Sequence, residues 1–305
     1  MNMLTVNGVS KSFGSHKIID NLSFEVPKHS IYGFIGQNGA GKTTTMKMIL
    51  GLLAPDAGEI LINGEKVTTN KNKTNCFVGY LPDVPEYYEY MTPKEYLRLC
   101  GRITGLDKKN VDERANKMLN VVGLSSYKKR IRGFSRGMKQ RLGIAQALLH
   151  KPKLLICDEP TSALDPIGRK EILDILSSVR EETTVLFSTH ILTDVERICD
   201  NIAFIDKGEI ILSGSLDEVK SSHKTFGIEI LFENEKDAKQ FFEVFPGGKW
   251  GNSYQLQYYP QERYKIFAYM KYIAKNQMQI HKIEQLEPTL EDLFLKIMEK
   301  EVNIR

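Results

Sequence analysis

The stretch Gly36-Gln37-Asn38-Gly39-Ala40-Gly41-Lys42-Thr43 constrains this chain more than any other, because it fills every fixed position of the G-x-x-x-x-G-K-[ST] phosphate-binding loop. Glycine adopts left-handed dihedrals and lets backbone N–H groups approach an anion, so the three glycines permit a loop around a polyphosphate. We expect Lys42 to supply a charge to the β and γ phosphates and Thr43 a hydroxyl to Mg²⁺.

The residues on both sides of the loop have the pattern that such a site needs. Ile31 to Ile35 reads as a buried strand, and Thr44 to Leu50 reads as a helix that ends at Gly51. A phosphate would therefore lie at a helix N-terminus, where free N–H groups and the helix dipole favour negative charge. The alternative, a glycine-rich turn with a chance lysine, leaves this strand and helix unexplained.

Composition sets wider limits on the fold and on the partners. The 305 residues exceed one average domain and suggest two, and an apolar content of 41% is enough for a core. The net charge of +4 does not by itself argue for nucleic acid, and it suits an anionic membrane surface equally well. No apolar run approaches the ~20 residues of a membrane-spanning helix, so we expect any membrane role to come through a partner.

Cysteine usage predicts a reducing environment. The four cysteines are scattered without a C-x-x-C pair, which indicates neither a zinc site nor a disulfide framework. The N-terminus lacks the basic-then-apolar pattern of a secretory signal. A cytoplasmic location is the expectation.

A helical segment interrupts the alternation of strands and helices. Thr92, Pro93 and Glu95 form a capping-box pattern that predicts the start of a helix, and a second amphipathic helix ends at Gly123. We interpret residues of about 87–150 as a helical subdomain inserted into the sheet domain. Within it, Ser135 is well placed as the N-cap of a further helix.

Two carboxylates follow a buried strand later in the chain. The apolar run from Leu154 to Cys157 ends in Asp158 and Glu159, and charges in such a position are costly unless they have a task. In a phosphate-loop enzyme, Asp158 would hold the Mg²⁺ shell and Glu159 would polarise the water that attacks the γ phosphate. The next strand, Thr184 to Thr189, delivers His190 at its end, where ligands bind to sheets of this kind.

At this point the chain resembles the ATP-binding subunit of an ATP-binding cassette (ABC) transporter, across roughly residues 1 to 219. The phosphate loop matches Walker A, Leu154 to Glu159 matches Walker B, Ser135-Arg136-Gly137-Met138 the signature, Ser162 to Asp165 the D-loop, and His190 the switch histidine. On residue chemistry alone, core packing is the favoured role of Phe13, and stacking on a nucleotide base is the alternative. The resemblance favours stacking, because Phe13 falls where the family has its adenine-stacking aromatic residue.

The resemblance implies a set of site residues. Catalysis would involve Lys42, Glu159 and His190, and the metal would be held by Thr43, Asp158 and Asp83. The residues implied in ATP binding are Phe13, Gly36, Asn38, Gly39, Ala40, Gly41, Lys42, Thr43, Thr44, Ser135, Gly137 and Asp165.

The resemblance also implies a mechanism and partners. In this family two ATPase domains close face to face, with each ATP between one subunit's Walker A and the other's signature, and this closure drives attached membrane subunits. The chain carries one copy of each motif, so we expect a homodimer that acts with a separate membrane permease. The expected location is the inner face of the cell membrane, with membrane contact only through the permease and no contact with nucleic acid.

Two motifs depart from the family pattern. Asp83 stands where a glutamine is common, and its shorter side chain is expected to reach the metal only through water. Arg136 replaces the usual first glycine of the signature, and Met138 replaces a glutamine. We hypothesise that Arg136 adds positive charge near the γ phosphate, the alternative being an arginine that faces solvent. The run Lys139 to Ala145 is similar to that of bacitracin-type and other peptide-antibiotic export ATPases.

Beyond residue 219 the composition changes. Fourteen of the twenty-eight aromatic residues lie there, which supports a small core of its own. Strand-like and helix-like runs alternate from Ile228 to a last helix from Thr289, and Glu287 to Phe294 resembles the C-terminal motif of drug-export ATPases. We therefore predict an ABC ATPase domain over residues 1–219 and an accessory α+β domain over residues 220–305.

The predicted fold is α/β and of the phosphate-loop ABC ATPase type, with a mixed core sheet, an N-terminal antiparallel β subdomain and the inserted helical subdomain. The predicted function is an ATPase that energises export of a drug or peptide antibiotic through a separate permease. One alternative is a soluble ABC ATPase not coupled to transport, and another is a module that binds ATP without turnover. The intact Glu159 and His190 argue against the latter.

Overall fold

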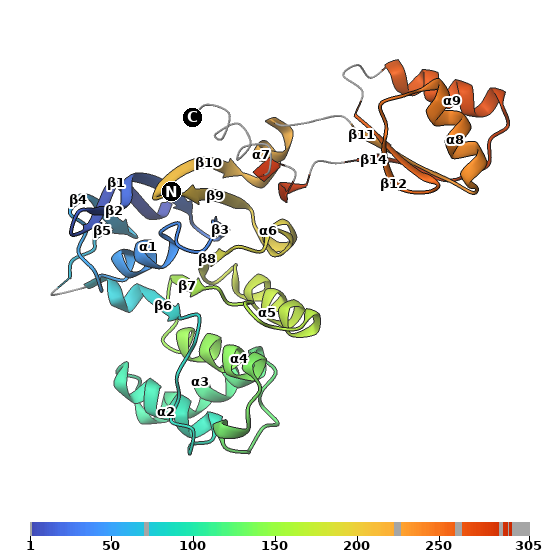
Figure 1. The fold of residues 1–305 in the computed structure, drawn as a ribbon. Coiled ribbons are helices and arrows are strands. Elements are labelled where there is room, and N and C mark those ends of the chain that lie inside the picture. Colours follow the sequence, from blue (N-terminus) through green and yellow to red (C-terminus); the bar gives the residue numbers. More distant parts are fainter. Residues whose placement is uncertain are drawn as a thin grey trace. The chain divides into compact units, whose positions relative to one another are not determined.

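The computed structural model describes residues 2–69, 73–222, 227–259, 264–286, 289–291 and 293–294. It divides into two compact units, Met1–Leu216 and Asp217–Arg305, each of which is described by itself (Figure 1). In the described part of the chain, no helix combines the length and the apolar character needed to cross a bilayer.

The first unit is built on a mixed sheet of six strands in the order β10-β9-β3-β8-β7-β6. Its strands are β3 (Ile31–Ile35), β6 (Val78–Leu81), β7 (Leu154–Asp158), β8 (Thr184–Thr189), β9 (Asn201–Asp206) and β10 (Glu209–Ser215). All neighbours in this sheet are parallel except β9 and β10. The carboxyl ends of β3, β6, β7 and β8 therefore meet at one edge of the sheet, where ligands of such folds bind.

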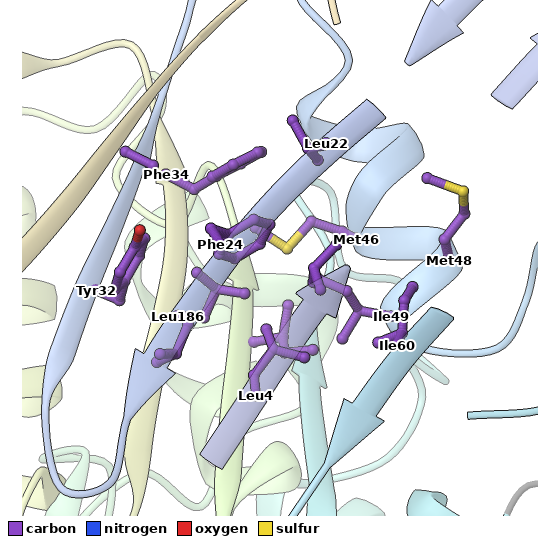
Figure 2. Packing of buried hydrophobic residues seen from close by; sticks show 14 of the residues in the cluster. Leu4, Leu22, Phe24, Tyr32, Phe34, Met46, Met48, Ile49, Ile60 and Leu186 are labelled. Atoms are coloured by element: carbon purple, nitrogen blue, oxygen red, sulfur yellow. The ribbon is translucent and has the colours of Figure 1, made fainter. Parts of the chain in front are cut away.

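A second, antiparallel sheet of the first unit has the order β2-β1-β4-β5. Its strands are β1 (Asn2–Phe13), β2 (His16–Pro27), β4 (Ala57–Ile62) and β5 (Glu65–Lys66). Between this sheet and the first one, a buried core joins both sheets to helix α1 (Lys42–Ile49). Phe24 of β2 stacks on Phe34 of β3 with ring centroids 5.2 Å apart, and Met46 of α1 lies in the same cluster (Figure 2). This core fixes the helix that follows the phosphate loop.

Helices fill the chain between β6 and β7, and others follow β7, β8 and β10 along the chain. They are α2 (Pro93–Ile103), α3 (Lys108–Val121), α4 (Arg136–Ala147), α5 (Pro166–Val179), α6 (Leu192–Ile198) and α7 (Leu216–Ser222), with short 3-10 turns η1 (Lys73–Phe77) and η2 (Ile131–Gly133). The predicted capping box is confirmed, because Thr92 Oγ1 accepts from Glu95 N–H while Glu95 Oε2 accepts from Thr92 N–H. These elements confirm the expected α/β class.

The second unit has the order β-α-β-β-α-β. Its elements are β11 (Gly227–Phe232), α8 (Glu235–Val244), β12 (Lys249–Asn252), β13 (Gln255–Tyr258), α9 (Tyr264–Lys275) and β14 (Ile280–Leu286), with strands in the order β12-β13-β11-β14. Alternate residues of β11, such as Ile228 and Ile230, face a core that contains Phe241 of α8 and Tyr269 of α9. Both helices therefore lie on one face of the sheet (Figure 1).

Two features of the second unit differ from the sequence-based expectation or lie beyond it. Strand β12 was not expected, because its four residues are exposed and have no apolar alternation to mark a strand. The last helix was expected from Thr289 and included Leu290, Leu293, Phe294, Ile297 and Met298. Of this stretch the structure describes residues 289–291 and 293–294, in which Leu290 and Leu293 are buried, while Glu287, Pro288, Ile297 and Met298 lie outside the described residues.

Candidate active site at the strand ends

The phosphate loop connects β3 to α1 and has the backbone that its sequence requires. Gly41, the N-cap of α1, has φ 108° and ψ 2°, and Gly39 has φ 86°. A Cβ at Gly41 would lie 2.4 Å from Ile19 Cδ1, and one at Gly36 would lie 2.5 Å from the carbonyl oxygen of Ile205. Side chains at these positions would therefore push the loop away from the strands that support it.

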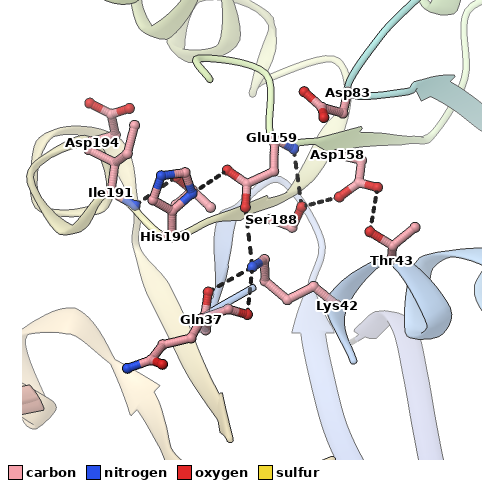
Figure 3. Close-up of polar contacts among 12 residues, drawn as sticks. Gln37, Lys42, Thr43, Asp83, Asp158, Glu159, Ser188, His190, Ile191 and Asp194 are labelled. Atoms are coloured by element: carbon pink, nitrogen blue, oxygen red, sulfur yellow. Dashed lines mark hydrogen bonds and ion pairs between the residues drawn. The ribbon is translucent and has the colours of Figure 1, made fainter. Parts of the chain in front are cut away.

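Lys42 is fixed across the loop by backbone carbonyls. Its Nζ donates to the carbonyl oxygens of Gly36 at 2.7 Å and Gln37 at 3.2 Å, and the side chain is 6% exposed. The same Nζ lies 3.2 Å from Glu159 Oε1, an ion-pair contact in which Oε1 makes no well-aligned hydrogen bond to the described residues. The ammonium group is thus held close to the loop and beside the proposed catalytic carboxylate (Figure 3).

Asp158 ends β7 and accepts two hydroxyl hydrogen bonds. Its Oδ2 accepts from Thr43 Oγ1 at 2.9 Å, and its Oδ1 accepts from Ser188 Oγ at 2.5 Å. The residue is 4% exposed and has no cationic partner in the parts of the chain that the structure describes. A buried carboxylate without a countercharge, next to the hydroxyl of Thr43, is a donor set that fits a hard divalent cation whose remaining ligands are phosphate and water.

Glu159 adopts a left-handed backbone conformation with φ 48°, which is uncommon for a residue other than glycine. Its N–H donates to the carbonyl oxygen and the hydroxyl of Ser188, at 3.2 and 3.1 Å. Its Oε2 lies 2.9 Å from Nδ1 of His190, which must carry the proton because a carboxylate only accepts. Backbone strain at such a residue persists where its surroundings fix it, and functional sites are where this is commonly found.

These groups surround a pocket of about 360 Å³. The residues that line it are Ile18, Asn38, Gly39, Gly41, Lys42, Thr43, Thr44, Asp83, Asp158 and Glu159. A larger cavity of about 480 Å³ lies among α2, α3 and the loop that follows them. No acidic residue lines that cavity, so the smaller pocket is the one at which catalytic groups converge.

Tyr80 lies on β6, and both its burial and the negative charge near the pocket affect its pKa. Burial, followed by the charges of Asp158, Cys157 and Asp83, raises the pKa of Tyr80 to about 12.

Several residues that the sequence predicts for the site do not line this pocket. Phe13 ends β1, is 54% exposed and lies under the ammonium group of Lys11 at 5.7 Å. Ser135 caps α4 by accepting from Met138 N–H, and Asp165 caps α5 by accepting from Gly168 N–H. Gly137, in the first turn of α4, is also absent from the lining. Their predicted roles toward ATP stay predictions.

Sequence reasoning missed two residues at the site. The hydroxyl of Ser188 donates to Asp158 and accepts from the backbone N–H of Glu159. The sequence feature that could have indicated Ser188 is its position on a buried strand, two residues before His190. Ile18 of β2 lines the pocket, although an isoleucine in a strand of alternating pattern gives no reason to expect this.

Comparisons with known proteins decide the family. The family description "ABC transporter" matches residues 19–162. The chain is 38% identical to the uncharacterized ABC transporter ATP-binding protein YxlF of Bacillus subtilis (strain 168), over 97% of this chain and 99% of that protein. The chain belongs to the ABC transporter ATP-binding proteins.

The chain is also similar in sequence to named transport ATP-binding proteins and to a solved structure. It is 35% identical to the bacitracin transport ATP-binding protein BcrA of Bacillus licheniformis, over 97% of both chains. It is 37% identical to the lantibiotic transport ATP-binding protein SrtF of Streptococcus pyogenes, over 77% of this chain and 100% of that protein. A solved structure of an ATP-binding subunit of an ABC transporter matches 72% of this chain and 92% of that one, with a TM-score of 0.65 and 32% identity. The protein is therefore an ATP-binding subunit that hydrolyses ATP and works with separate membrane permease components.

Proposed function

We propose that this ABC protein energises the export of a drug or peptide antibiotic through its permease. The observation that carries the substrate class is the similarity, over nearly the whole of both chains, to a bacitracin transport ATP-binding protein. The lantibiotic transport protein SrtF supports the same class, because lantibiotics and bacitracin are both peptide antibiotics.

The catalytic step follows from the contacts of Glu159. Its carboxylate would accept a proton from the water that attacks the γ phosphate, and the contact with Nδ1 of His190 would hold it in position. Lys42 contacts both the loop and this carboxylate, so its ammonium group would stabilise negative charge that develops on the phosphate oxygens. We assign Mg²⁺ to Asp158 and Thr43, where it would offset charge on the β and γ phosphates.

A pair of subunits is part of this proposal. Ser135 and Gly137 lie outside the lining of the chain's own phosphate pocket, which supports a role at the ATP of a second copy. Closure of two copies around two ATP molecules would then move the permease. The protein would lie at the inner face of the membrane through this permease contact.

Copurification tests the coupling to a membrane partner. The tagged full-length chain, expressed in its native host, is purified from detergent-solubilised membranes. We expect an integral membrane protein to be retained in stoichiometric amounts and cells to gain tolerance to bacitracin that Glu159→Gln abolishes. A chain that binds no integral membrane protein would instead be a soluble ABC ATPase, and retention without any peptide-antibiotic phenotype would contradict the substrate class.

A further inference from the structure

Two of the positions at which the chain departs from the family pattern, Asp83 and Arg136, contact each other. Arg136 is the first residue of α4, and its Nη2 lies 3.2 Å from Oδ1 of Asp83, which follows β6. Asp83 also lines the phosphate pocket. The ion pair therefore links the pocket wall to the end of the helix that carries Ser135 and Gly137.

A second contact from the same helix holds the backbone of Asp83. Gln140 lies four residues after Arg136 and so on the same face of α4. Gln140 is fully buried, and its Nε2 donates to the carbonyl oxygen of Asp83 at 2.7 Å. Helix α4 thus holds Asp83 at two points, by its carboxylate and by its carbonyl group.

The charges around the pocket explain what the pair does. Three carboxylates line it, those of Asp83, Asp158 and Glu159. Lys42 lies beside Glu159, Arg136 lies beside Asp83, and Asp158 receives only hydroxyl donors in the described structure. Because the ligand of this pocket is the polyanion ATP, each carboxylate without a countercharge repels it. Arg136 supplies the countercharge for Asp83.

We propose that Arg136 is a positioning residue of its own subunit's nucleotide pocket: it holds the Asp83 carboxylate against α4 and neutralises it at the pocket wall. In this role Arg136 acts through Asp83, in place of a direct contact with the γ phosphate of ATP. The inference rests on ATP binding by this family and is independent of the transported substrate.

The directions in which two substitutions change the affinity for ATP test this role. Arg136→Ala leaves the Asp83 carboxylate uncompensated, and we expect it to weaken binding of Mg²⁺-free ATP about three- to six-fold, the effect of a half-exposed ion pair. Asp83→Asn leaves the arginine charge uncompensated and should strengthen that binding. The double variant should return close to the parent affinity, and Arg136→Lys should keep it. Calorimetry with the full chain and ATP in EDTA measures each dissociation constant.

The matched control lies on the same helix. Lys139 pairs with Glu89 at 2.8 Å, and neither residue lines the pocket, so Lys139→Ala removes the same charge without exposing a pocket carboxylate. We expect no change in affinity for this variant and a loss of the Arg136→Ala effect at high salt. The proposal would be overturned if Lys139→Ala weakened ATP binding as much as Arg136→Ala does. It would also be overturned if Arg136→Ala and Asp83→Asn changed the affinity in the same direction, or if neither of these two variants changed it. Melting curves of all variants identify loss of folding, and if Arg136→Ala does not fold, the direction of the Asp83→Asn effect carries the test.

Discussion

At the scale of single residues, Glu159 concentrates the constraints of the site. Glu159 has a left-handed backbone conformation, and its N–H donates to both the carbonyl oxygen and the hydroxyl of Ser188. Its carboxylate also contacts His190 and Lys42, so few orientations are open to it. A non-glycine residue in this region costs on the order of 1 kcal/mol or more. The surrounding contacts oppose that cost and leave the carboxylate at the pocket wall.

Replacement of Glu159 by glutamine separates binding from turnover. The amide oxygen can still accept from His190, but the amide cannot take a proton from the attacking water, so hydrolysis should fall by about 10²- to 10⁴-fold. ATP affinity should change little, and ATP should then trap a closed dimer. Single-turnover hydrolysis and nucleotide titration measure both quantities, and near-normal hydrolysis would remove Glu159 from the role of base.

Much of this site could be predicted from spacing alone. The phosphate loop, Asp158, Glu159 and His190 follow buried strands, and parallel strands bring their carboxyl ends together. Ser188 could not be predicted, because a serine within a buried strand has no pattern that distinguishes a bridging role from packing. The contact between Arg136 and Asp83 is also invisible in sequence, since 52 residues separate them and only the fold of α4 against β6 brings them together.

At the scale of elements, the packing of α4 on β6 depends on a glycine. A Cβ at Gly79 would lie 2.2 Å from the carbonyl oxygen of Ala147, and neither backbone can yield cheaply. Gly79→Ala should therefore lower the free energy of unfolding by about 1–3 kcal/mol. Urea denaturation measures this change.

A second glycine provides the control for that experiment. A Cβ at Gly133 would meet no atom within 4 Å, and Gly133 does not have a positive φ. Gly133→Ala should leave stability unchanged or raise it slightly, because alanine restricts the unfolded chain. If both variants lost the same stability, the close approach of β6 and α4 would not be the cause.

The turn after α4 predicts a dependence of stability on pH. His150 Nε2 donates to the carbonyl oxygen of Val78 at 3.1 Å. Burial, together with the charge of Arg114, lowers the pKa of His150 below the usual 6.5, although this hydrogen bond opposes the shift. Below pH 6.5 the unfolded chain therefore binds a proton that the folded chain does not, and folding loses stability as the pH falls. His150→Gln should flatten the fall in unfolding free energy between about pH 7.5 and 5.5 relative to the parent. Parallel curves for both proteins would exclude His150 as a source.

The elements themselves could be predicted unevenly. The capping box at Thr92 and the buried strands of the central sheet were correct, because caps and apolar runs are local signals. Strand β12 escaped prediction, since it forms by pairing with β13 and has four exposed residues, among them Gly251. The pairing of distant strands is a property of the fold, and no local pattern records it.

At the scale of the whole molecule, the position of Ser135 predicts that subunits complement each other. If Ser135 acts at the ATP of a second copy, mixing a Lys42→Ala variant with a Ser135→Ala variant restores one complete site in the heterodimer. ATPase activity above that of either variant is expected, and differently tagged chains allow the heterodimer to be isolated. Proven heterodimers without any recovery would count against a dimer that shares its sites.

The two units also carry separate cores. The described core of the first unit runs from Met3 to Ile205, whereas that of the second runs from Ile228 to Met278. Every nucleotide motif precedes residue 217, where the second unit begins. We therefore predict that a chain shortened near Val219, within α7, folds alone and binds ATP with close to the parent affinity.

The same shortened chain tests what the second unit contributes. We propose that this unit supports the dimer, because it has its own aromatic core and no nucleotide motif. The shortened chain should then show weaker self-association by light scattering and lower cooperativity in steady-state ATP hydrolysis, although each pocket keeps its contacts. An insoluble product would refute separability. If a folded, ATP-binding product kept the association and cooperativity of the full chain, the supporting role would be refuted. The remaining candidate for the second unit would then be contact with the permease.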